Sequence, residues 1–204
     1  MATTQSPDHR HGSGPRIGVL AVQGAFAAHR EVFRRLGVDT VEVRQVRHLE
    51  GIDGLVLPGG ESTTMSKLTI SLGIFDAIAE RLADGMAAFG TCAGAILLSH
   101  HIADGRADQR CFSGLDIDVR RNGYGRQIDS FETDLAIRGF EDPFHATFIR
   151  APVIERCGEG VEVLASARDQ PVVVRQGRVI ATTFHPELGE DDRLHRYFLS
   201  VLGE

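Results

Sequence analysis

Short apolar runs alternate with amphipathic stretches along the first half of the chain. Strands are predicted at residues 16–22, 40–46, 55–57 and 86–89. The spacing of apolar positions predicts helices between them, at residues 25–36, 62–72, 74–84 and 93–101. Continuous apolar runs are typical of strands buried on both faces of a parallel sheet. The alternation therefore predicts an α/β fold in which helices cover both faces of a parallel sheet.

The second half of the chain is mostly β-like. Strands are predicted at residues 115–121, 130–137, 146–149, 161–166, 171–176 and 178–183. Gln176-Gly177 joins the last two and predicts a hairpin turn. Residues 191–202 form an amphipathic helix whose apolar face holds Leu194, Tyr197, Phe198 and Val201. We therefore expect a central, mostly parallel sheet with antiparallel strands added to it.

Length and composition fit one globular domain. Residues 15–204 are long enough to bury a core, whereas residues 1–14 are polar and aperiodic and predict a disordered tail. The formal net charge of -6 argues against nucleic acid as a partner, because such binding needs a basic surface. Three cysteines are too few for a disulfide scaffold. With neither a secretory signal nor the ~20 apolar residues that a membrane helix needs, we expect a cytoplasmic location and no membrane partner.

Residues 86–98 carry the strongest chemical signal. An apolar strand runs into Gly90-Thr91-Cys92-Ala93-Gly94, and a predicted helix follows. This is the strand–turn–helix context of a nucleophile elbow, with cysteine as the nucleophile. The two glycines give the strained turn room, and the N–H of Ala93 points where an oxyanion would form. The alternative is a buried structural cysteine in a glycine-rich turn.

A second signal lies near the C-terminus. His185-Pro186-Glu187 follows the predicted strand 178–183, which places the histidine at the rim of the sheet, where an elbow also lies. A nucleophilic cysteine needs a base, and Glu187 can orient that base. The other histidines have no comparable setting and are interpreted as surface or partly packed residues: His9, His11, His29, His48, His100, His101, His145 and His195. The pair His100-His101 lacks further ligands at metal spacing, so no metal site is expected.

Pro58-Gly59-Gly60 follows a predicted strand and leaves backbone N–H groups open to a ligand. Ser62 or Thr63 can cap the helix that comes next. The segment is not a phosphate-binding P-loop, because no Gly-Lys-Ser/Thr follows. Val22-Gln23-Gly24 stands where a dinucleotide-binding protein would have its glycine motif. The sequence therefore does not support a nucleotide site.

Taken together, these motifs resemble the class I (triad) glutamine amidotransferases. The resemblance rests on Gly-Thr-Cys-Ala-Gly around Cys92, on His185-Pro186-Glu187 and on Pro-Gly-Gly-Glu-Ser. Residues 18–24, 58–64, 121–127, 129–132 and 148–152 further resemble one family of that class, the glutaminase subunits of pyridoxal 5'-phosphate synthase. The resemblance covers about residues 16–202. It implies the three-layer class I glutamine amidotransferase-like fold.

The resemblance also implies a reaction, the hydrolysis of L-glutamine to L-glutamate and ammonia without a cofactor. Cys92 would attack the side-chain amide, His185 would move the proton, and Glu187 would orient the imidazole. The N–H groups of Gly60 and Ala93 would form the oxyanion hole. The implied glutamine-binding residues are Gly60, Glu61, Ser62, Arg121, Ile149 and Arg150, and Gln23 matches a position near the oxyanion loop. Arg121 and Arg150 could instead be ordinary surface ion-pair residues, and Cys111 and Cys157 have no expected role.

A partner is implied as well. The ammonia would pass to a (β/α)8-barrel pyridoxal 5'-phosphate synthase subunit, in a complex with twelve copies of each subunit. Two alternatives remain: a related enzyme, either an amidotransferase with another acceptor or a γ-glutamyl hydrolase, and a non-catalytic module that keeps the fold. The segments at residues 121–127 and 129–132 argue against the first, and the complete triad argues against the second.

Overall fold

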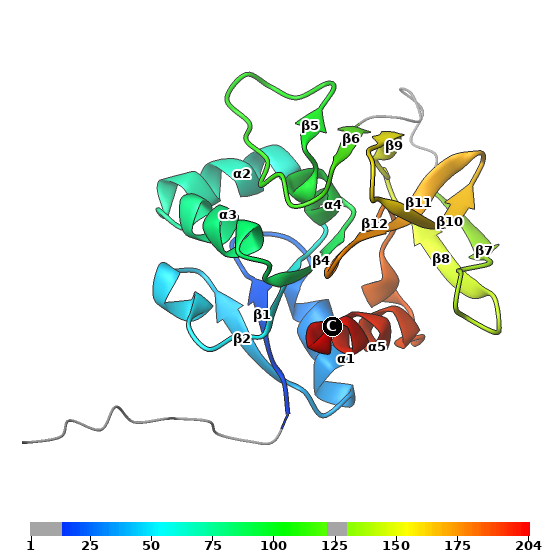
Figure 1. The fold of residues 1–204 in the computed structure, drawn as a ribbon, viewed down its shortest axis with the longest axis horizontal. Coiled ribbons are helices and arrows are strands. Elements are labelled where there is room, and N and C mark those ends of the chain that lie inside the picture. The colour runs from blue at the N-terminus through cyan, green and yellow to red at the C-terminus, as the bar shows by residue number, and fades with distance from the viewer. Residues whose placement is uncertain (1–13, 122–129) are drawn as a thin grey trace, which may run out of the picture.

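The computed structural model describes residues 14–121 and 130–204. Except for Gly14, the predicted tail lies outside the described residues, as do residues 122–129, which hold most of one family-like segment. The main element is a seven-stranded sheet of order β10-β11-β12-β4-β3-β1-β2 (Figure 1). Its parallel strands are β1 (Arg16–Leu20), β2 (Asp39–Val43), β3 (Gly54–Leu57), β4 (Ala87–Thr91) and β12 (Val179–Thr182).

Helices cover both faces of this sheet, as the sequence predicts (Figure 1). One face carries α1 (Phe26–Arg35) and α5 (Arg193–Ser200), and the other carries α2 (Ser62–Ser71), α3 (Phe75–Ala83) and α4 (Ala93–Leu98). Short 3-10 turns follow several elements: η1 (Val46–Leu49), η2 (Pro186–Leu188) and η3 (Val201–Gly203). Because side chains alternate along a strand, Leu55 and Leu57 enter one apolar cluster and Val56 enters the other. The result is a three-layer arrangement with a core on each side of the sheet.

Two predicted antiparallel strands extend the sheet beyond β12. They are β10 (Glu162–Ala167) and β11 (Gln170–Gln176), which pair antiparallel with each other, and β11 pairs antiparallel with β12. Gln176 pairs with Val179, so the predicted hairpin at Gln176-Gly177 is confirmed. Gly177 has φ 56, a left-handed conformation that glycine adopts without strain.

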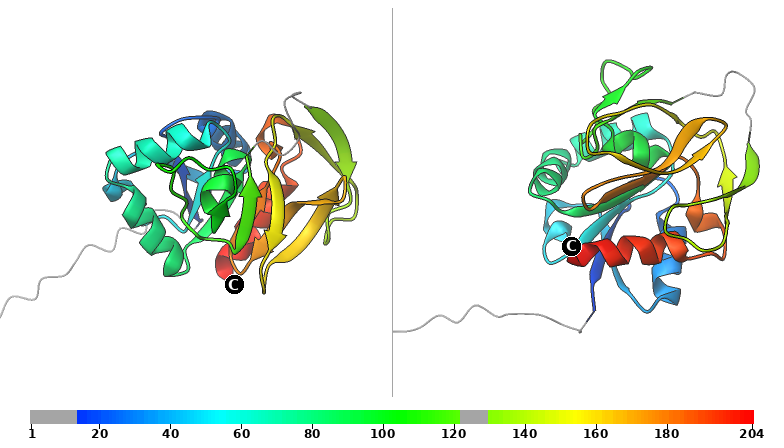
Figure 2. Two further views of the ribbon diagram at one scale, coloured as in Figure 1. Left: turned by 90° about the horizontal axis from the view of Figure 1, so that it is seen from above. Right: turned by 45° about the vertical axis from the view of Figure 1, so that its right-hand side comes forward.

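The remaining antiparallel strands form two smaller sheets instead of joining the large one. One contains β5 (His101–Ile102), β6 (Ile117–Arg120) and β9 (Val153–Cys157), and the other contains β7 (Phe131–Leu135) and β8 (Phe144–Phe148). Figure 2 shows β7 and β8 at the end of the molecule opposite α2 and α3. The sequence prediction missed β9, whose exposed Glu155 and Arg156 hide the alternation. The predicted helix 93–101 ends early at Leu98, because Ser99 is extended.

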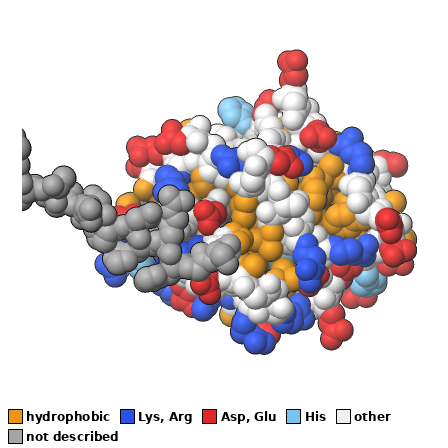
Figure 3. Space-filling model, turned by 60° about the horizontal axis from the view of Figure 1, so that its bottom comes forward, with side chains coloured by type: hydrophobic (Ala, Val, Ile, Leu, Met, Phe, Trp, Pro, Cys, Tyr) orange, Lys and Arg blue, Asp and Glu red, His pale blue; other side chains and the backbone are white. Residues whose placement is uncertain are grey.

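The surface agrees with the composition. On the face drawn in Figure 3, basic and acidic side chains are interspersed, so that face lacks the basic stripe of a nucleic-acid binder. Within the described ranges, no helix has both the length and the apolar character needed to cross a bilayer.

Candidate active site

A pocket of about 550 Å³ lies at the carboxyl ends of three parallel strands. Gly59 and Gly60 follow β3, Cys92 follows β4, and His185 follows β12. Ligands of open α/β sheets bind at this edge, because the loops that leave parallel strands converge there. The pocket lining holds almost every residue predicted for the site: Gln23, Gly60, Glu61, Ser62, Cys92, Ala93, Arg121, Ile149, Arg150 and His185. Glu187 is the exception, because it is buried behind His185.

Cys92 lies on the predicted elbow between β4 and α4. Its φ is 48, in a region that non-glycine residues rarely adopt, and its side chain is almost fully buried. The neighbouring glycines are required by packing. A Cβ added at Gly94 would lie 1.9 Å from the carbonyl oxygen of Leu57, and one at Gly90 would lie 2.6 Å from the side chain of Leu98. The strand and helix can meet this closely only without those side chains.

His185 and Glu187 form a hydrogen-bonded pair. Nδ1 of His185 lies 2.8 Å from Oε1 of Glu187, and η2 supplies the tight turn that brings the two side chains together. Burial alone would lower the pKa of His185, but the nearby Cys92 thiol and the hydrogen-bonded carboxylate of Glu187 raise that pKa to about 10. Burial favours the neutral form of Glu187, yet His29 and His185 hold its pKa below the usual value. The site therefore favours an imidazolium between two acidic groups.

Gly59 lies between the imidazole and the elbow. A Cβ added there would lie 2.4 Å from Cε1 of His185 and 3.5 Å from Cβ of Cys92. The carbonyl of Gly59 accepts a 2.9 Å hydrogen bond from the N–H of Ala25, which fixes the peptide joining Gly59 to Gly60. Oε1 of Gln23 accepts the next N–H, that of Glu61, at 2.9 Å. The segment after β1 therefore holds the loop that would contribute an oxyanion-hole donor.

The predicted glutamine-binding side chains of Glu61 and Ser62 already have structural partners. Glu61 caps α2 by accepting the N–H groups of Thr63 at 3.1 Å and Thr64 at 2.7 Å. The prediction that Ser62 or Thr63 caps this helix is therefore wrong, because the longer carboxylate reaches the same donors first. Oγ of Ser62 accepts a hydrogen bond from Nε2 of Gln109 at 3.1 Å.

The guanidinium of Arg121 is fixed by three oxygen atoms. It donates to Oγ1 of Thr63 at 2.7 Å, to Oε1 of Gln109 at 3.1 Å and to the carbonyl of Asp104 at 2.8 Å. Gln109 therefore connects Ser62 with Arg121 across the pocket wall. Sequence reasoning missed Gln109, which lies in a loop without motif or periodicity.

Ile149 and Arg150 border the pocket next to the elbow. The carbonyl oxygen of Ile149 lies 4.0 Å from Sγ of Cys92. Arg150 has φ 47, a strained conformation for a residue with a side chain, and it is exposed. Arg150 therefore combines a strained backbone with a place in the pocket lining.

Two histidines that were interpreted as surface or partly packed residues are fully buried. His29 of α1 and His195 of α5 are both 0% exposed, so that interpretation was wrong for them. Nε2 of His29 lies 3.5 Å from Oε2 of Glu187. A signal did exist, because His29 is three positions from Phe26 and from Val32 and therefore lies on the apolar side of its helix.

The other two cysteines lie away from the pocket. Cys111 and Cys157 are half-buried, and burial raises the pKa of both thiols. A thiol with a raised pKa is a poor nucleophile at neutral pH. In residues 14–121 and 130–204, no three His, Cys, Asp or Glu side chains are arranged to hold a metal ion.

Comparison with known proteins places this geometry in context. Residues 19–203 match the model of the SNO glutamine amidotransferase family. The chain is similar to the pyridoxal 5'-phosphate synthase subunit PdxT of Thermus thermophilus, with 54% identity over 92% of this chain and 97% of the relative. PdxT of Corynebacterium jeikeium is 52% identical over 91% of this chain and 96% of the relative. A solved structure titled as a glutamine amidotransferase is 53% identical, with a TM-score of 0.87, and the match covers 92% of this chain and 99% of that one.

Proposed function

The chain belongs to the SNO glutamine amidotransferase family, and we propose that it releases ammonia from L-glutamine with Cys92, His185 and Glu187 as its catalytic triad. Its relatives are subunits of pyridoxal 5'-phosphate synthase. The chain is accordingly the glutaminase subunit of such a synthase and supplies ammonia for vitamin B6 synthesis. The assignment of roles to individual residues is our proposal, and the observation that carries it is the His185–Glu187 pair facing the elbow cysteine.

The first half of the reaction uses His185 as the base. Its pKa is raised to about 10, so the imidazole takes the proton of the Cys92 thiol as the sulfur attacks and holds it as an imidazolium. The thiolate attacks the side-chain amide carbon of glutamine and forms a tetrahedral oxyanion. The imidazolium then gives its proton to the departing nitrogen, the C–N bond breaks, and ammonia leaves a glutamyl thioester on Cys92.

The second half returns the site to its starting state. Neutral His185 removes a proton from water, which attacks the thioester carbonyl. Collapse of the second tetrahedral intermediate breaks the C–S bond, releases glutamate and returns the proton to the Cys92 sulfur. Glu187 keeps the imidazole in one orientation and stabilises its positive charge, as an orienting carboxylate does in other triads.

Backbone donors are proposed to stabilise the oxyanion. They are the N–H of Ala93, at the start of α4 directly after Cys92, and that of Gly60. Two such donors act strongly in a site that excludes water. The hydrogen bond from Ala25 to the Gly59 carbonyl supports this assignment, since it fixes the direction of the Gly60 N–H in the same peptide.

The amino acid end of glutamine is a zwitterion, and both of its charges need partners. We assign it to the pocket side formed by Glu61, Ser62, Arg121 and the Ile149–Arg150 pair. Arg121 and Arg150 provide positive charge for the substrate carboxylate. The carboxylate of Glu61 and nearby carbonyl oxygens provide acceptors for the ammonium group.

The chain works with a partner synthase subunit, since its relatives are named as subunits of pyridoxal 5'-phosphate synthase. We assign that partner to a (β/α)8 barrel and the complex to twelve copies of each subunit. Leu188 and Ile149 are large apolar residues exposed at the pocket border, 53% and 36% respectively, and support a docking surface there. The mass of the complex formed with the cognate synthase subunit measures the stoichiometry.

The decisive experiment is a glutaminase assay of the complex with Cys92→Ala. The variant is expected to fold and dock like the wild type and to release no ammonia from glutamine. A glutamine-analogue electrophile should label Cys92 and leave Cys111 and Cys157 unmodified, which makes these two thiols internal controls. Ammonia release by the variant at the wild-type rate would overturn the assignment.

A further inference from the structure

A cluster of polar side chains lies buried directly behind the proposed triad. It consists of His29 on α1, Thr91 on β4 and His195 on α5, and all three are 0% exposed. Nδ1 of His29 lies 3.0 Å from Nε2 of His195, and Nε2 of His29 lies 3.0 Å from Oγ1 of Thr91. Thr91 is the residue before the elbow cysteine. His29 therefore connects its own helix, α1, with α5 and with β4, the strand that precedes Cys92.

The same histidine faces the free oxygen of Glu187. Oε1 of Glu187 bonds His185, whereas the buried Oε2 has no hydrogen bond within the described part of the chain. Nε2 of His29 lies 3.5 Å from Oε2, longer than a full hydrogen bond but close for a dipole and a charge. A buried carboxylate oxygen without a donor is costly, so a donor held at this position matters.

Chemistry decides which nitrogen of His29 carries the proton. A bare Nε2 could accept from the Thr91 hydroxyl but would direct its lone pair at the carboxylate, whereas an Nε2–H donates to Oγ1 of Thr91 and directs positive charge at the carboxylate. Nδ1 is then the acceptor for the N–H of His195. Nδ1 of His195 has no hydrogen bond within the described residues and serves as an unprotonated nitrogen. The arrangement works with both rings neutral.

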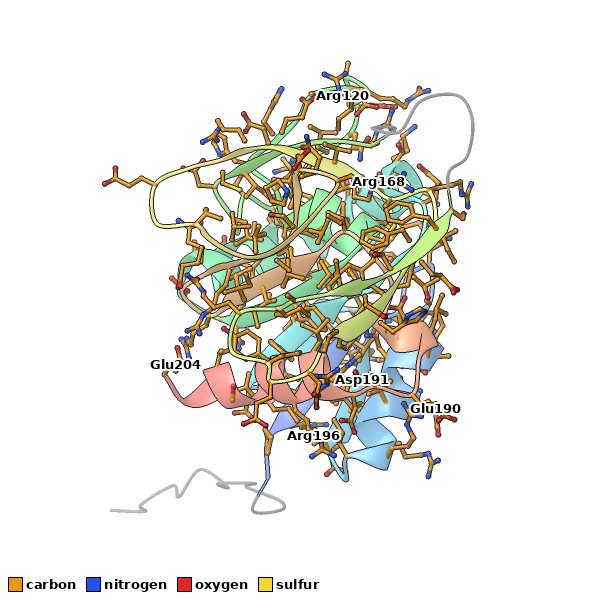
Figure 4. All side chains as sticks on the ribbon, turned by 90° about the vertical axis from the view of Figure 1, so that its right-hand side faces the viewer. Arg120, Arg168, Glu190, Asp191, Arg196 and Glu204 are labelled. Carbon is orange, nitrogen blue, oxygen red and sulfur yellow. The ribbon has the colours of Figure 1, made fainter. Side chains whose placement is uncertain are left out.

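The surroundings give no structural reason for polar groups at this place. The rings of Phe33 and Phe89 pack edge-on against His195 at 5.2 and 5.5 Å, and the ring of Phe89 also meets His29 edge-on at 6.2 Å. Polar side chains inside an aromatic cluster cost stability relative to well-packed apolar ones. Arg196, the next residue on α5, points outward (Figure 4) and pairs with Asp192. His195 therefore lies on the side of α5 that faces the core.

We propose that His29 is a positioning residue of the triad: its Nε2–H holds Oε2 of Glu187, and His195 and Thr91 hold His29. Glu187 is then restrained from both sides, with one oxygen toward His185 and the other toward His29. The proposal rests on the function proposed above. The charged or titratable groups around His29 are Glu187 and His185 beside the pocket, His195 on α5, and Arg35 at the end of α1, which acts on His195.

Three substitutions of His29 distinguish the effect of its Nε2–H donor from the effect of the imidazole ring as a whole. His29→Gln keeps an N–H donor near the position of Nε2, His29→Asn places its amide near Nδ1 instead, and His29→Leu removes the donor at similar volume. Val32→Ala, a buried substitution on the same helix, controls for loss of stability. Each full-length variant is assayed for glutamine hydrolysis in complex with the cognate synthase subunit, as a function of pH.

We expect His29→Leu and His29→Asn to lower kcat by roughly 10- to 100-fold, with KM changed by less than about twofold. The acidic limb of kcat/KM should move to higher pH by about one unit, because the Glu187 anion loses a donor. His29→Gln should stay near the wild type in both respects, and Val32→Ala should leave the profile in place. Wild-type kcat and pH profile in His29→Leu or His29→Asn, or a His29→Gln variant as slow as His29→Leu, would overturn the proposal.

A second readout does not depend on activity. The pKa of the Glu187 carboxyl is followed by 13C NMR in the isolated full-length chain. It should rise by about one unit in His29→Asn and His29→Leu but not in His29→Gln. If His29→Leu fails to fold, the comparison of Gln with Asn decides. If the wild-type complex releases no ammonia, the proposed function fails, and the NMR titration still tests the contact: an unchanged Glu187 pKa in His29→Asn overturns it.

Discussion

Adding one methyl group at Gly59 tests the geometry of the site directly. A Cβ at this position would lie 2.4 Å from Cε1 and 2.9 Å from Nδ1 of His185, and 3.5 Å from Cβ of Cys92. The backbone of Gly59 does not have the positive φ that would strain an alanine there. The substitution Gly59→Ala therefore acts through the imidazole and not through the turn.

The size of the effect follows from these distances. Contact between two carbon atoms is ordinary from about 3.5 Å, so the ring must move away by about 1 Å. The hydrogen bond from Nδ1 to Oε1 of Glu187 is 2.8 Å long and would be broken or bent by that displacement. A misplacement of about 1 Å in a reacting group can lower the rate by about 100-fold. We expect a loss of this order in kcat, with a smaller change in KM because the glutamine-binding side of the pocket is not touched.

The assay is steady-state glutamine hydrolysis by the complex with the synthase subunit, beside the thermal unfolding of each chain. Gly189→Ala is the matched control. Gly189 lies in the loop that follows Glu187, and a Cβ added there would meet only the backbone nitrogen of Asp191, at an ordinary contact distance of 3.8 Å. Gly189→Ala should keep the wild-type unfolding temperature and activity, whereas Gly59→Ala should lose activity while it still unfolds in one cooperative transition. A Gly59→Ala enzyme with wild-type kcat would show that the imidazole is placed differently in the working enzyme and would refute the reasoning.

Three further predictions concern stability and substrate binding. Burial lowers the pKa of His195 to about 2, whereas in the unfolded chain that pKa is about 6.5. Between these two pKa values only the unfolded chain takes up the proton. The stability that neutral His195 contributes is therefore complete above about pH 6.5 and is lost as the pH falls below it. Urea unfolding between pH 7 and pH 5 should therefore show His195→Leu losing about 2 kcal/mol less than the wild type. Glu61→Ala removes the cap of α2 and should lower the unfolding free energy by about 1 kcal/mol, measured in the same way; an unchanged value would mean that the cap contributes nothing. Gln109→Leu removes an acceptor that holds Arg121 and should raise KM for glutamine by about 3- to 10-fold at unchanged kcat; a pure kcat effect would contradict this role.

The strands and helices that local pattern predicts well are those with a single dominant environment. β3 and β4 are buried on both faces, so their continuous apolar runs are unambiguous. β9 was missed because its exposed Glu155 and Arg156 pair with Arg120 and Asp118 on the neighbouring strand. An ion-pair ladder between strands is a property of the pairing, which a single segment does not display.

The residues of the candidate site also fall into those that local sequence predicts and those that depend on distant partners. The elbow at Cys92 is local, because a strand, a tight turn and a helix need glycines at fixed offsets along the chain. The polar partners are not local: Gln109 reaches Arg121 from a loop without motif, and His29 meets His195 across 166 positions of sequence. Gln109 on its own resembles an ordinary polar surface residue, whereas the apolar side of α1 indicates that His29 is buried but not which residue it meets.

The sequence by itself determined the layered α/β arrangement and predicted the proposed nucleophile, because periodicity and turn chemistry act over a few neighbouring residues. The family-like motifs also predicted the three residues of the proposed triad. Only the tertiary structure decided that Glu61 caps α2, that Arg121 is anchored, and that α1 and α5 bury two histidines behind Glu187. Burial and partner choice depend on which surfaces meet, and that information exists only once the helices are packed on the sheet.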